Sequence, residues 1–174
     1  VYVFADPATQ SARPVPQALR NLFTRFEAGE AMVDIKTGDW ATLGQGAATV
    51  RHAVFVAEQG IAPGMERDAE DATAIHAVAC NGLGQCIATG RLVSHASHAG
   101  KIGRMAVHHG LRGTGLGRQI LHALLDASRQ RGDGEVVLHA QCGAEGFYRR
   151  LGFAPRGKPF EEAGIAHIEM VRIP

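Results

Sequence analysis

Apolar residues recur along this chain with two periods, every three to four residues in some segments and every second residue in others. The run with helical spacing nearest the N-terminus consists of Leu19, Leu22, Phe23 and Phe26. It predicts one short amphipathic helix within an N-terminal arm that covers residues 1–30. From residue 31 a strand-like alternation ends at Gly38, and helical spacing returns over residues 41–59. A strand followed by a helix therefore opens a main domain, which we expect to cover residues 31–174.

Short apolar runs separated by turn residues predict most of the remaining elements. Two of these runs flank the dipeptide Asn81-Gly82, a turn signal that predicts a β-hairpin. The expected elements are strands over 74–80, 86–93 and 101–107, a helix over 116–131, a strand over 135–140, a short helix over 145–151, and strands over 154–159 and 165–173. Hairpins followed by a strand, glycine loop, helix and strand predict an α+β domain, whose mixed, mostly antiparallel sheet is flanked by helices.

Composition excludes some functions without defining one. At 174 residues with 45% hydrophobic content, the chain has enough apolar material for one compact domain. A formal net charge of +1, with no dense run of Lys and Arg, argues against a nucleic-acid partner. No apolar run reaches the roughly 18 to 20 residues that span a bilayer, so we expect no membrane partner.

Cysteine and histidine usage indicates neither a disulfide framework nor a metal site. The three cysteines are Cys80, Cys86 and Cys142. An odd number without CxxC spacing argues against a disulfide framework and a thiolate zinc site, and a reducing cytoplasm fits best. The histidines nearest one another are His95, His98, His108 and His109. They form no recognised ligand pattern, so we expect no metal.

The strand expected over 101–107 runs into a glycine-rich segment that opens the next helix. Its sequence is Arg112-Gly113-Thr114-Gly115-Leu116-Gly117-Arg118. Glycines let backbone amides approach an anion, and the unpaired amides and dipole of a helix N-terminus favour a phosphate. Arg112 and Arg118 add positive charge, and Arg suits bidentate phosphate contacts. The segment therefore predicts a phosphate-binding loop.

Two other phosphate-binding loops share this outline, and both fail a test on the residues. A P-loop needs Lys and then Ser or Thr after its last glycine, where this chain has Arg118 and Gln119. The GxGxxG pattern of dinucleotide folds fits nowhere in the segment. The strand that follows also ends in His139, Ala140 and Gln141 rather than in an acid.

Residues 112–117 resemble the Arg/Gln-x-x-Gly-x-Gly/Ala pyrophosphate loop of the GNAT superfamily of N-acetyltransferases. The superfamily's Ala-x-x-Phe-Tyr-x-x-x-Gly-Phe run is matched by Ala144, Phe147, Tyr148, Gly152 and Phe153. The resemblance covers roughly residues 32–173 and implies a GNAT-like fold with a splayed central strand pair. Three segments further resemble a branch of small bacterial acetyltransferases whose substrates are mostly unassigned. Their sequences are VRHAVFVAEQGIAPGMERDAED, HAQ and FEEAGIAHIEM.

The resemblance implies acetyl-CoA as the cosubstrate and gives each matched segment a role. The backbone of Met105, Ala106 and Val107 would pair with the pantetheine arm and polarise the thioester carbonyl. Residues 112–118 would bind the pyrophosphate, and Phe147 completes the expected cofactor-binding set. Tyr148 would protonate the departing thiolate, a task that suits a phenol with a pKa near 10, although a buried Tyr can also simply anchor its helix.

A general base must take the proton of the attacking amine, and several residues are candidates. Glu70 and Asp71 lie in GIAPGMERDAED, whose turn formers and four acids predict an acidic surface loop that could instead bind a cationic amine. His76 and His139 have the right intrinsic pKa, although a lone His on an apolar strand is usually a core residue. Cys142 is a less favoured alternative, as an acyl-accepting thiol. Three residues match the narrower branch without a known role: Glu58, Gln59 and His167.

These inferences predict an acetyl-CoA-dependent N-acetyltransferase. It would acetylate a primary amine of a small molecule or peptide by direct attack in a ternary complex. Transfer of a longer acyl group and a non-catalytic acyl-CoA-binding sensor stay open as alternatives. The arm could cover the acceptor pocket or mediate contacts in a homodimer.

Overall fold

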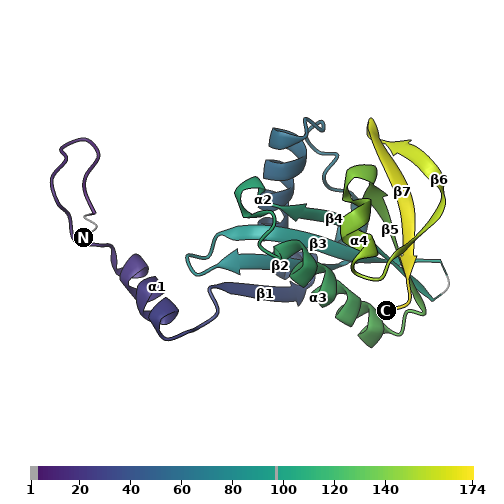
Figure 1. The fold of residues 1–174 in the computed structure, drawn as a ribbon, viewed down its shortest axis with the longest axis horizontal. Coiled ribbons are helices and arrows are strands. Elements are labelled where there is room, and N and C mark those ends of the chain that lie inside the picture. Colours follow the sequence, from purple (N-terminus) through teal and green to yellow (C-terminus); the bar gives the residue numbers. More distant parts are fainter. Residues whose placement is uncertain (1–3, 97) are drawn as a thin grey trace.

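A seven-stranded sheet organises the chain, with strand order β1-β2-β3-β4-β5-β7-β6 (Figure 1). The structure is a computed structural model, and it describes residues 4–96 and 98–174. The strands are β1 (Val33–Gly38), β2 (Ile75–Asn81), β3 (Cys86–His95), β4 (Ala99–Val107), β5 (Glu135–Gln141), β6 (Ala154–Glu162) and β7 (Ile165–Arg172). Every neighbouring pair is antiparallel except β4 and β5, which are parallel. The predicted α+β class and mostly antiparallel mixed sheet are confirmed.

The helices begin and end near the residues that the sequence marks. They are α1 (Gln17–Glu27), α2 (Trp40–Arg51), α3 (Leu116–Arg131) and α4 (Glu145–Arg149), with 3-10 turns η2 (Ala69–Ala72), η3 (His109–Leu111) and η4 (Cys142–Ala144). Asp39 caps α2 by accepting a hydrogen bond from the Thr42 amide at 2.9 Å. The second half of the helix expected over 41–59 is a π-helix, η1 (His52–Glu58).

Helices α2 and α3 cover opposite faces of the sheet, as the alternation along β2 shows. Ala77 and Ala79 belong to the core under α3, whose buried side chains include Leu121 and Leu124. The intervening Val78 faces α2, where a Cβ at Gly46 would lie 3.4 Å from it. Because successive strand residues point to opposite faces, β2 is buried on both sides.

The parallel pair of strands separates halfway along its length. Pairing runs from Ala99 opposite Glu135 to Ile102 opposite Leu138 and stops there. The register between β3 and β4 also shifts beyond this point, where Arg104 has a φ of 52°. The rest of β4 and the end of β5 therefore diverge, which confirms the predicted splayed pair.

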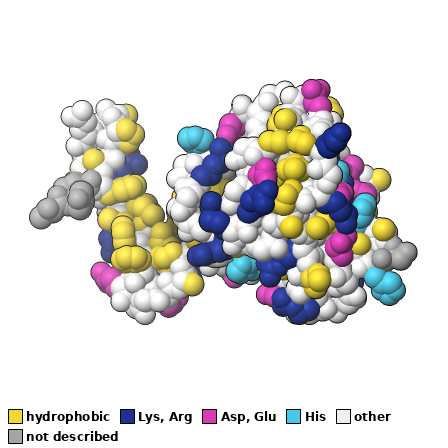
Figure 2. Space-filling view, turned by 45° about the vertical axis from the view of Figure 1, so that its right-hand side comes forward, with side chains coloured by type: hydrophobic (Ala, Val, Ile, Leu, Met, Phe, Trp, Pro, Cys, Tyr) yellow, Lys and Arg dark blue, Asp and Glu magenta, His cyan; other side chains and the backbone are white. Residues whose placement is uncertain are grey.

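The N-terminal arm stands away from the sheet (Figure 1). None of the α1 residues is buried, and the side chains of Phe23 and Phe26 are 59% and 67% exposed. The arm approaches the domain at the turn between β2 and β3, where a Cβ at Gly82 would meet Leu22. Figure 2 shows the resulting apolar face of the arm as a continuous yellow surface. The predicted helix is confirmed, and the boundary at residue 30 stays a prediction.

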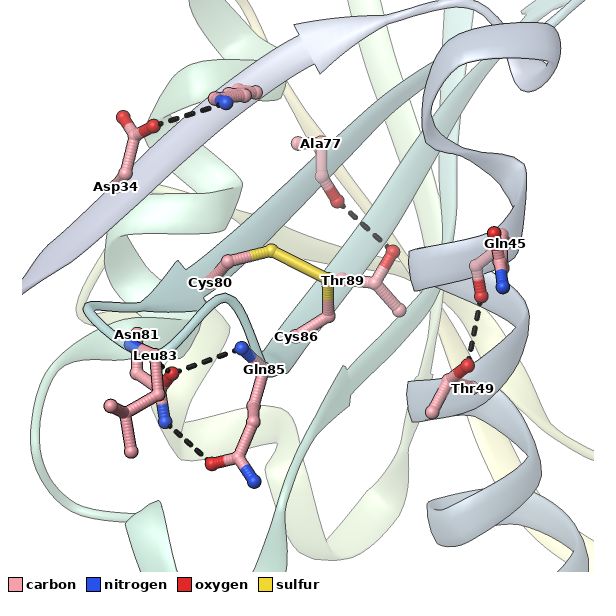
Figure 3. The surroundings of a disulfide bond; sticks show 11 residues. Asp34, Gln45, Thr49, Ala77, Cys80, Asn81, Leu83, Gln85, Cys86 and Thr89 are labelled. Carbon is pink, nitrogen blue, oxygen red and sulfur yellow. Dashed lines mark hydrogen bonds and ion pairs between the residues drawn. A yellow bond between two sulfur atoms is a disulfide. The ribbon is translucent and has the colours of Figure 1, made fainter. Parts of the chain in front are cut away.

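The expectation about the cysteines is wrong for one pair. Cys80 and Cys86 form a disulfide across the β2–β3 hairpin, while Cys142 is free (Figure 3). The two cysteines are direct partners in the register of the hairpin, so their proximity follows from strand pairing and not from CxxC spacing. The cysteine count therefore gives no support to a reducing compartment.

Candidate active site

A pocket of about 340 Å³ opens where β4 and β5 diverge. Residues from several elements line it: η1 and the loop before η2, strands β3 to β5, helix α4 and the β6–β7 hairpin. The polar and charged residues that line it are Gln59, Glu66, Asp68, Glu70, Arg91, Lys101, Arg104, His139, Gln141, Tyr148, Glu162 and His167. Of the four expected catalytic residues, this pocket brings together Tyr148, Glu70 and His139.

Tyr148 reaches the pocket from α4 and is held by aromatic neighbours. Its ring makes edge contacts with Phe147 and Phe153, at centroid distances of 4.9 and 6.0 Å. Among the residues that the structure describes, none forms a hydrogen bond with its hydroxyl. Burial raises the pKa of Tyr148 to about 12, because the phenolate would be poorly solvated. The phenol is therefore neutral at physiological pH, and it is a weaker acid than a phenol with a pKa near 10.

His139 and Glu162, which also line the pocket, form a hydrogen-bonded pair. The Nδ1 atom of His139 lies 2.8 Å from Oε2 of Glu162, a residue on β6. The His139 ring also meets Phe160 edge-on, with centroids 4.8 Å apart. Burial favours the neutral acid at Glu162, but the hydrogen bond from His139 and the nearby positive charges outweigh it and lower the pKa of Glu162. A carboxylate on an imidazole orients the ring and stabilises its protonated form.

His167 has a defined tautomer in the same wall. Its Nδ1 atom lies 2.8 Å from the carbonyl oxygen of Ile165. Because a carbonyl can only accept, Nδ1 carries the proton and Nε2 of the neutral ring is left as an acceptor. The match of His167 to the narrower branch thus corresponds to a place in the pocket wall.

The acidic loop is not the solvated surface that the sequence predicts. Asp71 is buried and bonds to Arg51 at 2.8 Å and to Arg91 at 2.7 Å. Asp68 accepts hydrogen bonds from Arg91 at 2.6 and 2.7 Å and from Arg104 at 2.8 Å. The bond from Arg91, more than the opposing burial, lowers the pKa of Asp68 to about 2. Arginines far away in the sequence thus neutralise these acids, which sequence spacing does not reveal.

Glu70 and His76 lie in different surroundings. The Glu70 side chain is 60% exposed and accepts one hydrogen bond, from Arg91 at 3.0 Å. His76 is fully buried between Arg51, at 3.3 Å, and the backbone oxygen of Asp71, at 2.9 Å. Burial lowers the pKa of His76, and the residue does not line the pocket. This geometry favours a structural role for His76 over the expected catalytic one.

The glycine-rich segment presents its backbone as the sequence predicts. Gly113 and Gly115 have φ values of 83° and 92°, a region in which L-residues with side chains are strained, and Gly115 caps α3. Between described residues, no hydrogen bond is donated by the backbone amides of residues 113–118. A Cβ at Gly117 would lie 3.5 Å from Phe147 and 3.6 Å from Val107, so the loop packs closely over both residues. This geometry suits a bound phosphate group.

Arg112 makes a contact that the sequence does not predict. Its guanidinium donates to both carboxylate oxygens of Glu58, at 2.6 and 2.7 Å, and to the backbone oxygen of Val107 at 3.2 Å. The hydrogen bond from Arg112 lowers the pKa of Glu58. The pair ties the loop to the end of η1 and explains the acid at position 58. A contact between Arg112 and a phosphate stays a prediction.

Sequence reasoning missed the residues whose partners come from distant segments. These are Lys101, Arg91, Arg104 and Glu162. Glu162 stands in the FEEAGIAHIEM segment that carries part of the resemblance, but only the folded sheet, in which β7 lies between β5 and β6, brings it to His139. Within residues 4–96 and 98–174, no cluster of three or more His, Cys, Asp or Glu is arranged to hold a metal ion. No helix in that part of the chain has the length and apolar character needed to cross a bilayer.

Comparison with known proteins identifies the family. A family model described as an acetyltransferase (GNAT) domain matches residues 47–173. A Bacillus subtilis (strain 168) protein named as a candidate acetyltransferase is 32% identical over 124 residues, which cover 71% of this chain and 84% of the relative. The chain therefore belongs to the GNAT acetyltransferase family, whose members transfer an acyl group from acyl-CoA to an amine.

Solved structures agree with this assignment. An acyl-CoA N-acyltransferase from Pseudomonas aeruginosa is 32% identical with a TM-score of 0.71, covering 80% of this chain and 99% of that one. A candidate N-acetyltransferase from Lactobacillus plantarum is 30% identical with a TM-score of 0.75, covering 82% and 99%. ElaA from Escherichia coli is 29% identical with a TM-score of 0.72, covering 81% and 99%. Each structure is matched almost completely, so the part of this chain that lies outside the matches is an addition relative to them.

Proposed function

We propose that this protein is an acetyl-CoA-dependent N-acetyltransferase that acetylates the primary amine of a small molecule or peptide by direct attack. The observation that carries the proposal is the pocket between the diverging halves of β4 and β5, which is lined by Tyr148 and by the His139–Glu162 pair. An acid and a base that line the same pocket suit a reaction that moves a proton from amine to thiolate.

Backbone groups account for coenzyme binding in this proposal. The amides of residues 113–118 and the N-terminus of α3 would hold the pyrophosphate. The half of β4 that is not paired with β5, Met105 to Val107, would pair with the pantetheine arm and direct an amide at the thioester carbonyl. The Phe147 ring packs on the backbone of Gly117 and so supports the loop. Arg118 adds charge at the start of α3.

The chemical step then uses Tyr148 as the acid and His139 as the base. The amine nitrogen attacks the thioester carbonyl carbon, so that a C–N bond forms and the C–S bond breaks. His139 takes the proton of the amine, and Glu162 stabilises the imidazolium. Tyr148 donates its proton to the departing thiolate, and both side chains recover their starting states by exchange with solvent. The net reaction moves one acetyl group to nitrogen and one proton to sulfur, and positioning of the reactants contributes much of the rate.

Calorimetric titration and a thiol-release assay test the proposal together. We expect the wild type to bind acetyl-CoA and CoA and to release CoA with some members of a panel of primary amines. Tyr148→Phe should bind acetyl-CoA unchanged and lose roughly a hundredfold or more in kcat, the usual size of a general acid's contribution. Absence of coenzyme binding would contradict the proposal outright. Tight binding without turnover of any amine would favour the acyl-CoA sensor instead.

A further inference from the structure

The charges in the pocket wall are almost all paired with one another. Arg91 bonds to Asp68, Glu70 and Asp71, and Arg104 bonds to Asp68. The acidic loop is therefore neutralised by guanidinium groups and does not form an anionic well for a polycation.

Lys101 is the exception among these cations. It extends from β4 into the pocket wall, where its nearest polar partner is Nδ1 of His139 at 3.5 Å. Within the described part of the chain, no carboxylate forms a salt bridge with its ammonium group. The Glu162 carboxylate is close to this ammonium but hydrogen-bonds to the ring, so a ligand carboxylate would give Lys101 the direct salt bridge that it lacks.

The space beside Lys101 is available to a ligand. Gly103 is the next residue along β4 that lines the same face, and a Cβ built on it would have no atom within 4 Å. At the same Nδ1 atom of His139 that Lys101 approaches, Glu162 presents a carboxylate that is 48% exposed and has one oxygen 2.8 Å from the ring nitrogen. An ammonium site at Glu162 and an anion site at Lys101 thus lie next to each other at one nitrogen of the same imidazole.

From this arrangement we infer that the acceptor is an amino acid, with its amine directed to His139 and Glu162 and its carboxylate bound by Lys101. The inference rests on the proposed acetyl transfer and names the substrate class of that site. A simple monoamine would leave Lys101 unpaired, and a diamine would place a second positive charge against it. The carboxylate of an amino acid satisfies the ammonium and holds the amine beside its base.

The test compares amino acids with analogues that lack the carboxylate. The acceptors are the L-amino acids, each paired with its carboxamide, and 4-aminobutanoate with butylamine and 1,4-diaminobutane. In the thiol-release assay we expect kcat/KM for the best amino acid to exceed that of its carboxamide about tenfold or more, which corresponds to roughly 1.4 kcal/mol. Lys101→Met should bring this ratio close to one by raising KM for the acid, and Lys101→Arg should keep most of it.

Two controls separate the possible failures. Lys158→Met removes an exposed lysine on β6 that does not line the pocket, and it should leave the ratio unchanged. Calorimetry on each variant should show unchanged acetyl-CoA affinity. If the wild type acetylates monoamines, diamines or carboxamides as well as the acids, or if Lys101→Met keeps the ratio, the inference is overturned and the acetyltransferase proposal stands. If the wild type binds no acetyl-CoA or acetylates no amine, both are overturned.

Discussion

The coenzyme side and the acceptor side of the proposed active site are built in different ways. The proposed coenzyme side is one continuous segment, residues 105–118, which offers backbone amides, packs on Phe147 at Gly117, and begins with Met105 in the pocket wall. The acceptor side comes from side chains on η1, the loop before η2, strands β3 to β5 and the β6–β7 hairpin. A site made of backbone tolerates many side chains but depends on glycine, whereas a site made of side chains depends on each of them. Substitutions on the coenzyme side should therefore mainly lower CoA affinity, and substitutions on the acceptor side should mainly lower kcat.

The largest expected effect is at Gly115. Gly115→Asp forces a side chain onto a φ of 92° and places a carboxylate beside the amides that would hold the pyrophosphate. We expect CoA affinity to fall by at least about a hundredfold, or roughly 2.7 kcal/mol, in a calorimetric titration. The matched control is Gly84→Asp, which has a φ of 78° in the β2–β3 turn and open space around it. Equal loss of CoA affinity in both variants would show that backbone strain, and not the loop, causes the effect.

The contrast between the two sides also explains what the sequence could predict. Helix α3 was predicted with both of its ends, because glycines stand at its N-cap and C-cap. The splayed pair followed from the family resemblance, which two motifs carry, at residues 112–117 and 144–153. The pairing of Glu162 with His139 and the arginines that bond to Asp68 and Asp71 were missed, since these contacts join segments that only the folded sheet brings together.

On the acceptor side, the two histidines of the pocket wall should differ in importance. His139→Gln removes the proton acceptor that Glu162 orients, and we expect kcat to fall about a hundredfold with acetyl-CoA affinity unchanged. His167→Gln is the matched control, and we expect a loss of less than about tenfold because this ring is fixed by a backbone carbonyl and not by a carboxylate. Steady-state rates across pH 6 to 9 measure both. The reverse order of effects would transfer the role of base to His167.

The acid network beside the pocket should affect stability more than chemistry. Asp68→Asn removes the carboxylate that holds Arg91 and Arg104, and we expect a loss of about 1 to 2 kcal/mol in the free energy of unfolding at pH 7. The pKa of Asp68 lies near 2 in the folded state against 3.8 ordinarily, so its stabilising contribution is complete above about pH 4 and disappears as pH falls toward 2.

Urea unfolding at several pH values checks this prediction. The difference between the wild type and Asp68→Asn should be constant from pH 7 to 5 and should shrink below pH 4. Asp126→Asn is the control, because that residue pairs with Arg129 on the exposed face of α3 and should change stability by less than about 0.5 kcal/mol. A difference that grows on acidification would contradict the assignment of the charged form to the folded state.

The smallest expected effect comes from the arm, which contributes to neither side of the pocket. Helix α1 has the apolar spacing of a packed helix yet buries none of its residues, whereas α3 buries six with a comparable pattern. Since amphipathic helices gain most of their stability from packing, removal of residues 1–30 should change the free energy of unfolding by less than about 0.5 kcal/mol. It should also leave kcat and KM for acetyl-CoA unchanged. Thermal unfolding and thiol release measure both, and a clear loss of activity in the shortened chain would mean that the arm reaches the active site of its own or a second copy.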